Sequence, residues 1–354
     1  MVLPTEPIGS LPRPPELIHA LAPNGGGTVD AGRLAELTAA AVADTIARLE
    51  AAGSPVVTDG EQAKPSFATY PIAGLKALAP DGVVIPFADG HTRQLPQLTA
   101  GPFRYQTNVT EYLTAAQRVA RVPVKQAVIA PSALSLLYPA SGIDGYSREQ
   151  FLADLADEAE ADIRGALNAG AHVVQLDFTE GRLSLKLDPS GGVLEDFIAL
   201  NNEVLGRFTP AERARIGVHT CPGGDLDSTH SLDVDYTGLL PALFRLNAGI
   251  FYLQLASEAD PQRALSVVAE NLGPEQRVFV GVIDPIDPRV ETPEEVRDRL
   301  LTAARFIPAD RLGSCDDCGF APFGDDTSTS RETAFAKVAA RVQGTALASE
   351  ALGV

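Results

Sequence analysis

The sequence has few cysteines, a deficit of basic residues and no long apolar run. Three cysteines are too few, and odd in number, for a disulfide framework, so we expect a reducing, cytoplasmic compartment. The chain carries 28 Lys and Arg against 46 Asp and Glu, and its net charge of −18 argues against nucleic-acid and membrane-surface partners, which are polyanions. No stretch reaches the roughly 18 apolar residues that span a bilayer, and the first residues show no secretory signal. An acidic, soluble enzyme is expected.

A junction between helix and strand recurs along the chain. Ala52-Gly53, Ala169-Gly170 and Ala248-Gly249 each end a predicted helix and precede a strand of β-branched or aromatic residues. A glycine after a helix, followed by a buried strand, is typical of a parallel α/β fold. About eight such strands predict a (β/α)8 TIM barrel that forms one domain over residues 1–354. A doubly wound sheet is the competitor, but no glycine-rich phosphate fingerprint follows a strand.

Local signals place the ends of several elements. Asp30 is expected to cap a helix, and Ser147 and Thr292 each begin a capping box at the start of another. Residues 82–105 alternate and contain turn residues, which predicts an inserted β-hairpin, and residues 236–247 predict one helix. A last helix is expected near 330–348. The expected strands are 4–9, 56–58, 122–130, 172–177, 215–220, 250–254, 277–284 and a short one before Cys315.

Polar side chains suited to chemistry follow the predicted strands and do not precede them. In a barrel, the loops after the strands share one mouth, where active sites lie. We therefore expect these residues to form one site. Each could also have a purely structural role, as a helix cap or as a buried polar group with its hydrogen bonds satisfied. They are Ser10, Asp59, Glu61, Asp177, His219, Cys221, Gln254, Glu258, Asp284 and Cys318.

Three of these residues have the chemistry of a metal site. His219 and Cys221 are two apart on an extended segment, so their side chains point the same way. Cys318 follows another short apolar segment about a hundred residues later. One imidazole and two thiolates are typical of a Zn²⁺ site with an exchangeable position. Cys315 is interpreted as a bystander thiol, because a zinc ribbon would need a second cysteine pair.

The remaining histidines are given structural interpretations. His172 begins a strand at the closed end of the barrel, and we expect it to be structural. His91 and His230 are interpreted as surface residues. Three arginines (Arg13, Arg182 and Arg289) are equally compatible with anion contacts at the mouth and with structural ion pairs.

The motifs resemble the catalytic barrel of the cobalamin-independent methionine synthase family, in its single-barrel form. The resemblance implies zinc held by His219, Cys221 and Cys318. It also implies a thiol substrate such as homocysteine, with its backbone near Ile8 and Ser10 and its amine near Glu61 and Asp177, and a catalytic role for Asp284. The segments that carry the likeness are 8–14 (IGSLPRP), 59–62 (DGEQ), 174–177 (VQLD), 219–221 (HTC), 281–284 (GVID), 288–290 (PRV) and 317–319 (DCG).

The chain departs from the family pattern at two positions. The family's fourth zinc ligand is a glutamate, and the corresponding residue here is Gln254, so the ligand is Gln254, Glu258 or an open site. The family also has a catalytic histidine between the positions of Asp284 and Pro288, where this chain has Pro-Ile-Asp. This change removes the expected proton donor to a folate leaving group. The chain has no Trp, so a pterin would have to stack on Phe, Tyr or Arg.

The favoured hypothesis is a zinc-dependent transferase that activates a small thiol for alkylation, most simply a methyltransferase with an altered donor. The alternatives are an epoxide-opening transferase of the coenzyme M type and a non-catalytic zinc-binding homologue. Two carboxylates, Glu61 and Asp177, would bind an ammonium group and so favour an amino-acid thiol over an anionic sulfonate. The expected partners are the thiol and an alkyl donor, and a homo-oligomer is left open.

Overall fold

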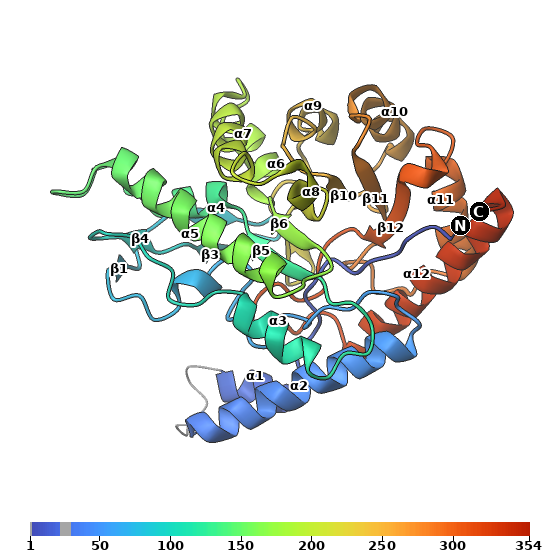
Figure 1. Cartoon of the computed structure of the whole chain (residues 1–354), viewed down its shortest axis with the longest axis horizontal. Coiled ribbons are helices and arrows are strands. Elements are labelled where there is room, and N and C mark those ends of the chain that lie inside the picture. The colour runs from blue at the N-terminus through green and yellow to red at the C-terminus, as the bar shows by residue number, and fades with distance from the viewer. Residues whose placement is uncertain (1, 22–29) are drawn as a thin grey trace.

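A parallel sheet of six strands forms the centre of the computed structural model, which describes residues 2–21 and 30–354. Its order is β12-β11-β10-β7-β6-β5, and helices surround it (Figure 1). Because neighbouring strands follow one another along the chain and run parallel, each connection crosses back outside the sheet. The strands are β5 (Gln126–Ile129), β6 (Val174–Asp177), β7 (Ile216–Thr220), β10 (Ile250–Leu253), β11 (Arg277–Ile283) and β12 (Leu312–Asp316).

Two short extended segments close the sheet into a barrel. Thr5 forms a parallel bridge with Ser314 of β12, and Val57 forms one with Val124 beside β5. These two segments then meet, because the amide of Leu11 donates to the carbonyl of Gly60 at 3.0 Å. Eight parallel segments therefore surround one interior, which confirms the predicted TIM barrel.

The outer layer consists of helices of very different length. The predicted capping boxes are present at Ser147 and Thr292, where each side chain accepts the backbone N–H of the third helical residue. The α-helices are α1 (Pro15–Leu21), α2 (Ala31–Ala51), α3 (Thr110–Gln117), α4 (Pro131–Ser135), α5 (Arg148–Asn168), α6 (Glu180–Leu187), α7 (Gly192–Leu205), α8 (Pro210–Arg213), α9 (Leu240–Leu243), α10 (Pro261–Asn271), α11 (Pro293–Ala303) and α12 (Arg331–Leu352).

The prediction of a single helix over residues 236–247 is wrong. The structure has a 3₁₀ turn at Tyr236–Gly238 and then the short helix α9. Pro241 lies in the first turn of α9, where its missing N–H and fixed φ are tolerated, so a second helical start replaces a continuous helix. Further 3₁₀ turns are found at Tyr70–Ile72 and Ala309–Arg311.

The inserted hairpin is present, but its outer pair begins before residue 82. Strands β2 (Val84–Pro86) and β3 (Thr92–Gln94) pair antiparallel, and β1 (Leu78–Ala79) pairs with β4 (Gln97–Leu98). A second small hairpin, β8 (Gly224–Asp225) with β9 (Ser228–Thr229), follows β7. The insertion is held to the barrel mouth by Arg93, which forms ion pairs with Asp225 of β8 and with Asp325.

The interior of the barrel is filled by its own apolar cluster, formed by Ile8, Val173, Ile250, Tyr252, Phe279 and Cys315. At the amino ends of the strands the charged Glu6 lies against Lys125 and His172, and it accepts the hydroxyl of Tyr252. Among the described residues, no helix is long and apolar enough to cross a membrane.

Candidate functional site

Three soft ligands meet at the carboxyl ends of two strands. His219 lies within β7, Cys221 directly follows that strand, and Cys318 is two residues beyond β12. Their ligating atoms all lie within 4.8 Å of one another, and the two sulfurs are 3.1 Å apart. The structure therefore brings together the residues predicted to bind zinc, and their role as ligands stays a prediction.

The surroundings of these side chains fit a metal ion. His219 is buried, yet neither ring nitrogen has a hydrogen-bond partner among the described residues. An unpartnered buried polar group is costly, and coordination would satisfy it. The hydrogen bond between the sulfurs raises the pKa of Cys221 well above its ordinary value, and lowers that of Cys318 well below it. No Asp or Glu of the described residues joins the group.

A small pocket of about 30 Å³ lies against these ligands, and we call it the central pocket. The pocket is lined by all four residues predicted to bind the thiol substrate, namely Ile8, Ser10, Glu61 and Asp177. His219 and Cys318 line it as well, together with Phe67, Thr179 and Pro322, which the sequence did not single out. The four substrate candidates and two of the metal candidates therefore share one space.

Close backbone packing sets the shape of the central pocket. A Cβ at Gly319 would lie 2.0 Å from the hydroxyl oxygen of Ser10, so only glycine lets the Cys318 loop approach the first segment this closely. The carbonyl of Ser10 also accepts the amide of Phe320 at 3.0 Å. This contact fixes Ser10 beside the metal candidates.

Glu61 has an unusual backbone and an unexpected partner. Its φ is +56°, a conformation that costs energy for a residue with a side chain, and Arg13 holds it by donating to its carbonyl at 2.7 Å. The Glu61 carboxylate forms a fully buried ion pair of 2.9 Å with Lys64. The sequence analysis did not single out Lys64. Its position three residues after Glu61 was the one sequence feature that could have indicated the pair.

Asp177 ends β6 and points into the same pocket. Burial raises its pKa to about 7, and His219 opposes this shift. The side-chain amide of Gln175 donates to it at 2.7 Å and fixes its orientation. Glu61 and Asp177 together place two carboxyl groups where the resemblance expects a substrate amine.

Both candidates for a fourth metal ligand contact Arg182. The guanidinium of this buried arginine donates to the side-chain oxygen of Gln254 at 2.9 Å and forms an ion pair with Glu258. The amide nitrogen of Gln254 donates to Ser257 at 2.7 Å. Arg182 is therefore a structural ion-pair residue in this state, and it already occupies one acceptor position on Gln254 and one on Glu258.

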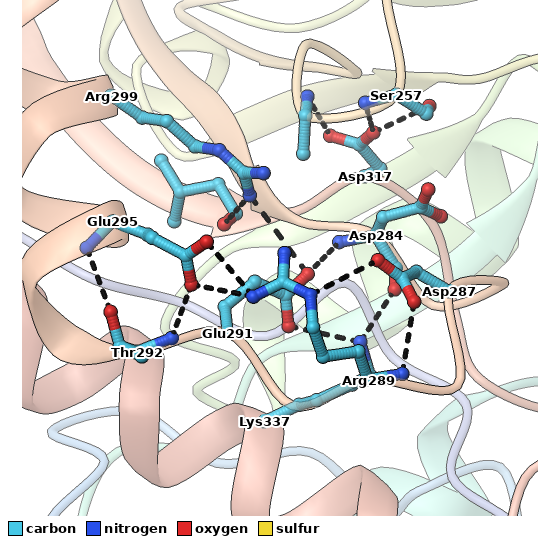
Figure 2. Close-up of polar contacts among 12 residues, drawn as sticks. Ser257, Asp284, Asp287, Arg289, Glu291, Thr292, Glu295, Arg299, Asp317 and Lys337 are labelled. Atoms are coloured by element: carbon cyan, nitrogen blue, oxygen red, sulfur yellow. Dashed lines mark hydrogen bonds and ion pairs between the residues drawn. The ribbon is translucent and has the colours of Figure 1, made fainter.

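Asp284 lies on the other side of Cys318, in a separate pocket of about 90 Å³. Figure 2 shows how the loop after β11 is held: the amide of Asp284 donates to Glu291, and Lys337 contacts both residues. Burial raises the pKa of Asp284. Cys318 lines both pockets, so Asp284 is close to the metal candidates but outside the central pocket.

Two sequence expectations near the site are corrected. Cys315 lies within β12, where a strand had been expected to end before it, and its buried thiol is absent from the ligand group. His230 is buried, so its interpretation as a surface residue is wrong, because Phe87 of the inserted hairpin packs edge-on against its ring. His91 stacks on the same phenylalanine and is half-buried. Arg13 binds backbone carbonyls and Arg289 pairs with Glu295.

Known proteins resemble this chain over its whole length. A methionine synthase of Sulfurisphaera tokodaii is 25% identical, over 99% of this chain and 94% of the relative. A 5-methyltetrahydropteroyltriglutamate–homocysteine methyltransferase of Rhodococcus jostii is 27% identical, and there the match covers 90% of this chain but 40% of the relative. This chain thus corresponds to less than half of such longer proteins.

Solved structures agree on the fold. A B12-independent methionine synthase from Shewanella, in complex with selenomethionine, superposes over 100% of both chains with a TM-score of 0.78 at 22% identity. One from Listeria monocytogenes gives a TM-score of 0.69. The family model for the catalytic domain of cobalamin-independent synthases matches residues 3–341 of the sequence. The chain therefore belongs to the cobalamin-independent synthase family, by way of its catalytic domain.

Proposed function

We propose that this protein is a zinc-dependent methyltransferase that methylates a small amino-acid thiol such as homocysteine. The observation that carries the proposal is the central pocket, where two metal candidates and two carboxyl groups line one space. Relatives named as methionine synthase and as homocysteine methyltransferase support the same chemistry.

Different residues around the central pocket would bind the thiol end and the ammonium end of the substrate. His219, Cys221 and Cys318 would hold the zinc ion, which supplies Lewis acidity that keeps a thiol ionised at neutral pH. Glu61 and Asp177 would bind the ammonium group through charge-assisted hydrogen bonds. Lys64 balances the charge of Glu61 when no ammonium group is bound.

Two buried carboxyl groups favour an amino-acid thiol over the sulfonate thiol of an epoxide-opening enzyme. An anionic sulfonate would lie beside Glu61 and Asp177, and like charges in a buried pocket repel strongly. We therefore retain the homocysteine-like substrate. Asp284, across Cys318, is proposed as a catalytic group on the side of the second pocket.

The test is metal content followed by thiol entry. The purified protein should contain about one zinc per chain, and Cys221→Ser and Cys318→Ser should each reduce this to near zero, whereas Cys315→Ser should not. In a cobalt-substituted sample, homocysteine should produce a sulfur-to-metal charge-transfer band. Zinc that is bound while no thiol enters its coordination shell would instead indicate a non-catalytic homologue.

A further inference from the structure

Two loops from distant parts of the chain form facing parts of the central pocket. One loop, residues 59–67, contributes Glu61, and we call it the amine loop. The other, residues 317–324, follows β12 and contributes Cys318, and we call it the metal loop. A ligand that contacts both Glu61 and a metal ion at Cys318 has to span the space between these loops. The spacing of the loops therefore decides which ligand fits.

Arg13 lies between the two loops and donates hydrogen bonds to both. Its side chain is buried, with 2% of the residue exposed. On the amine loop, its Nη2 donates to the carbonyls of Glu61 and Lys64, each at 2.7 Å. On the metal loop, its Nη1 donates to the carbonyls of Phe323 at 3.0 Å and Ala321 at 3.4 Å. Each terminal nitrogen of one guanidinium group thus binds one loop.

The shape of the guanidinium group makes Arg13 a spacer. Its nitrogens are held in a rigid, planar fork, so the positions of the two donors relative to each other are fixed. The sequence left Arg13 open as an anion contact or as a member of an ion pair. All four hydrogen bonds that it donates within the described chain go to backbone carbonyls, which is the pattern of neither role.

The amine loop is strained at the residue that Arg13 holds. Glu61 has a φ of +56°, in the left-handed region that a residue with a side chain seldom adopts. Asp59 accepts its amide at 3.0 Å, and Lys64 donates to its carboxylate at 2.9 Å. Both of these partners belong to the amine loop itself. The bond from Arg13 to the carbonyl of Glu61 is therefore the one of the three that relates Glu61 to the metal loop.

Backbone contacts join the two loops at their far ends without Arg13. The amide of Phe67 donates to the carbonyl of Pro322 at 2.9 Å, and the amide of Gly324 donates to the carbonyl of Pro65 at 2.8 Å. These bonds remain when the side chain of Arg13 is replaced. We therefore expect a substitution of Arg13 to change the spacing near Glu61 and to leave the two loops attached to each other.

We propose that Arg13 is a positioning residue that sets the span between Glu61 and the metal loop. It thereby selects an amino-acid thiol with two carbon atoms between its sulfur and its amine-bearing carbon. This inference rests on the proposed function, in which the sulfur binds the metal and the ammonium group binds Glu61. A thiol that is one methylene shorter cannot reach both fixed points unless the loops move, and a thiol without an ammonium group needs only one of them.

The test compares three thiols that differ at one position each: homocysteine, cysteine, and 4-mercaptobutyrate, which is homocysteine without its amino group. Their dissociation constants are measured by calorimetry on the zinc-loaded protein. Wild type should bind homocysteine at least about 10-fold more tightly than cysteine. In Arg13→Lys, which keeps the charge but replaces the fork by one nitrogen, this preference should fall to about 2-fold. The zinc content and the affinity for 4-mercaptobutyrate should not change.

The matched control is Arg311→Lys. Arg311 also donates to backbone carbonyls, those of Gly273 and Gln276, but these residues precede β11 and lie at the amino ends of the strands. This variant should bind all three thiols as wild type does.

A second variant tests the fork separately from the chain and serves even if Arg13→Lys does not fold. Arg13→Ala is purified with ethylguanidinium, which supplies the missing part of the side chain. Its preference for homocysteine over cysteine should be close to that of wild type with ethylguanidinium and should be lost on dialysis.

An unchanged preference in Arg13→Lys, or in dialysed Arg13→Ala, would overturn the role of Arg13. An equal loss of affinity for all three thiols, or a loss of zinc, would also overturn it, because it would indicate a general structural role. A wild type that binds homocysteine no better than cysteine would overturn this inference and leave the proposed function standing. A wild type that binds none of the three thiols would overturn the proposed function as well.

Discussion

The two ends of the barrel differ in the partners of their buried ionisable groups. At the amino ends of the strands, Glu6 is surrounded by Lys125, His172 and Tyr252, so its charge is compensated within the chain. At the carboxyl ends, His219 and the Oε2 of Glu180 are buried without partners among the described residues. The first arrangement compensates a buried charge within the chain, whereas the second leaves polar groups that a bound ion, ligand or water can satisfy.

The largest effect on stability is expected from Lys125→Met at the amino end. Lys125 is fully buried, lies 3.5 Å from Glu6 and stacks over the ring of Tyr252. Its removal leaves the buried Glu6 carboxylate with only His172 and the Tyr252 hydroxyl as partners, so the free energy of unfolding should fall by about 3–5 kcal/mol. Urea unfolding measures the loss. The double variant with Glu6→Gln should recover part of it, and additive losses would contradict the pairing.

A somewhat smaller effect should appear as pH dependence. Burial alone would raise the pKa of Glu6, but Lys125, His172 and Tyr252 outweigh it and lower the pKa to about 2 from 4.5. A group whose folded pKa is lowered stabilises the fold above its unfolded pKa. This contribution, on the order of 3 kcal/mol, should therefore be present above pH 4.5 and be lost as pH falls towards 2. Acid titrations of unfolding should show a steeper loss for wild type than for Glu6→Gln.

The smallest effect on stability is expected at the mouth. His219→Leu removes an imidazole that has no hydrogen-bond partner to lose, so the unfolding free energy of the chelator-treated protein should change by less than about 1 kcal/mol. Tyr252→Phe, which removes one bonded hydroxyl at the other end, should cost about 1–3 kcal/mol under the same conditions. If His219→Leu lowered the unfolding free energy more than Tyr252→Phe does, the proposed difference between the carboxyl and amino ends of the barrel would be contradicted.

Local sequence signals predicted the framework of this structure well. The capping boxes at Ser147 and Thr292 depend on residues three apart, so they can be seen in the sequence. The convergence of His219 and Cys318 followed from their place after strands, because parallel strands in a barrel end at one mouth. The helix over 236–247 failed because Pro241 begins a new helix within it.

The missed features depend on tertiary neighbours. Arg182 meets Gln254 and Glu258 across 72 and 76 positions of the chain, and no local pattern indicates such a contact. The burial of His230 likewise depends on Phe87, which is contributed by the inserted hairpin. Glu180 was not singled out because its surroundings combine Ser132 from α4 and Asn201 from α7. These surroundings exist only in the folded chain.

The meeting of the first and last segments has a consequence for biosynthesis. The amide of Leu3 donates to Ser349 of α12, 346 residues away, and both chain ends lie at the same side of Figure 1. At about 5–20 residues per second, a ribosome needs on the order of 20 to 70 s after making Leu3 to reach its partner Ser349. During this interval the segment around Thr5 has no strand on the side that Ser314 of β12 will cover, and such an exposed edge invites association with other chains.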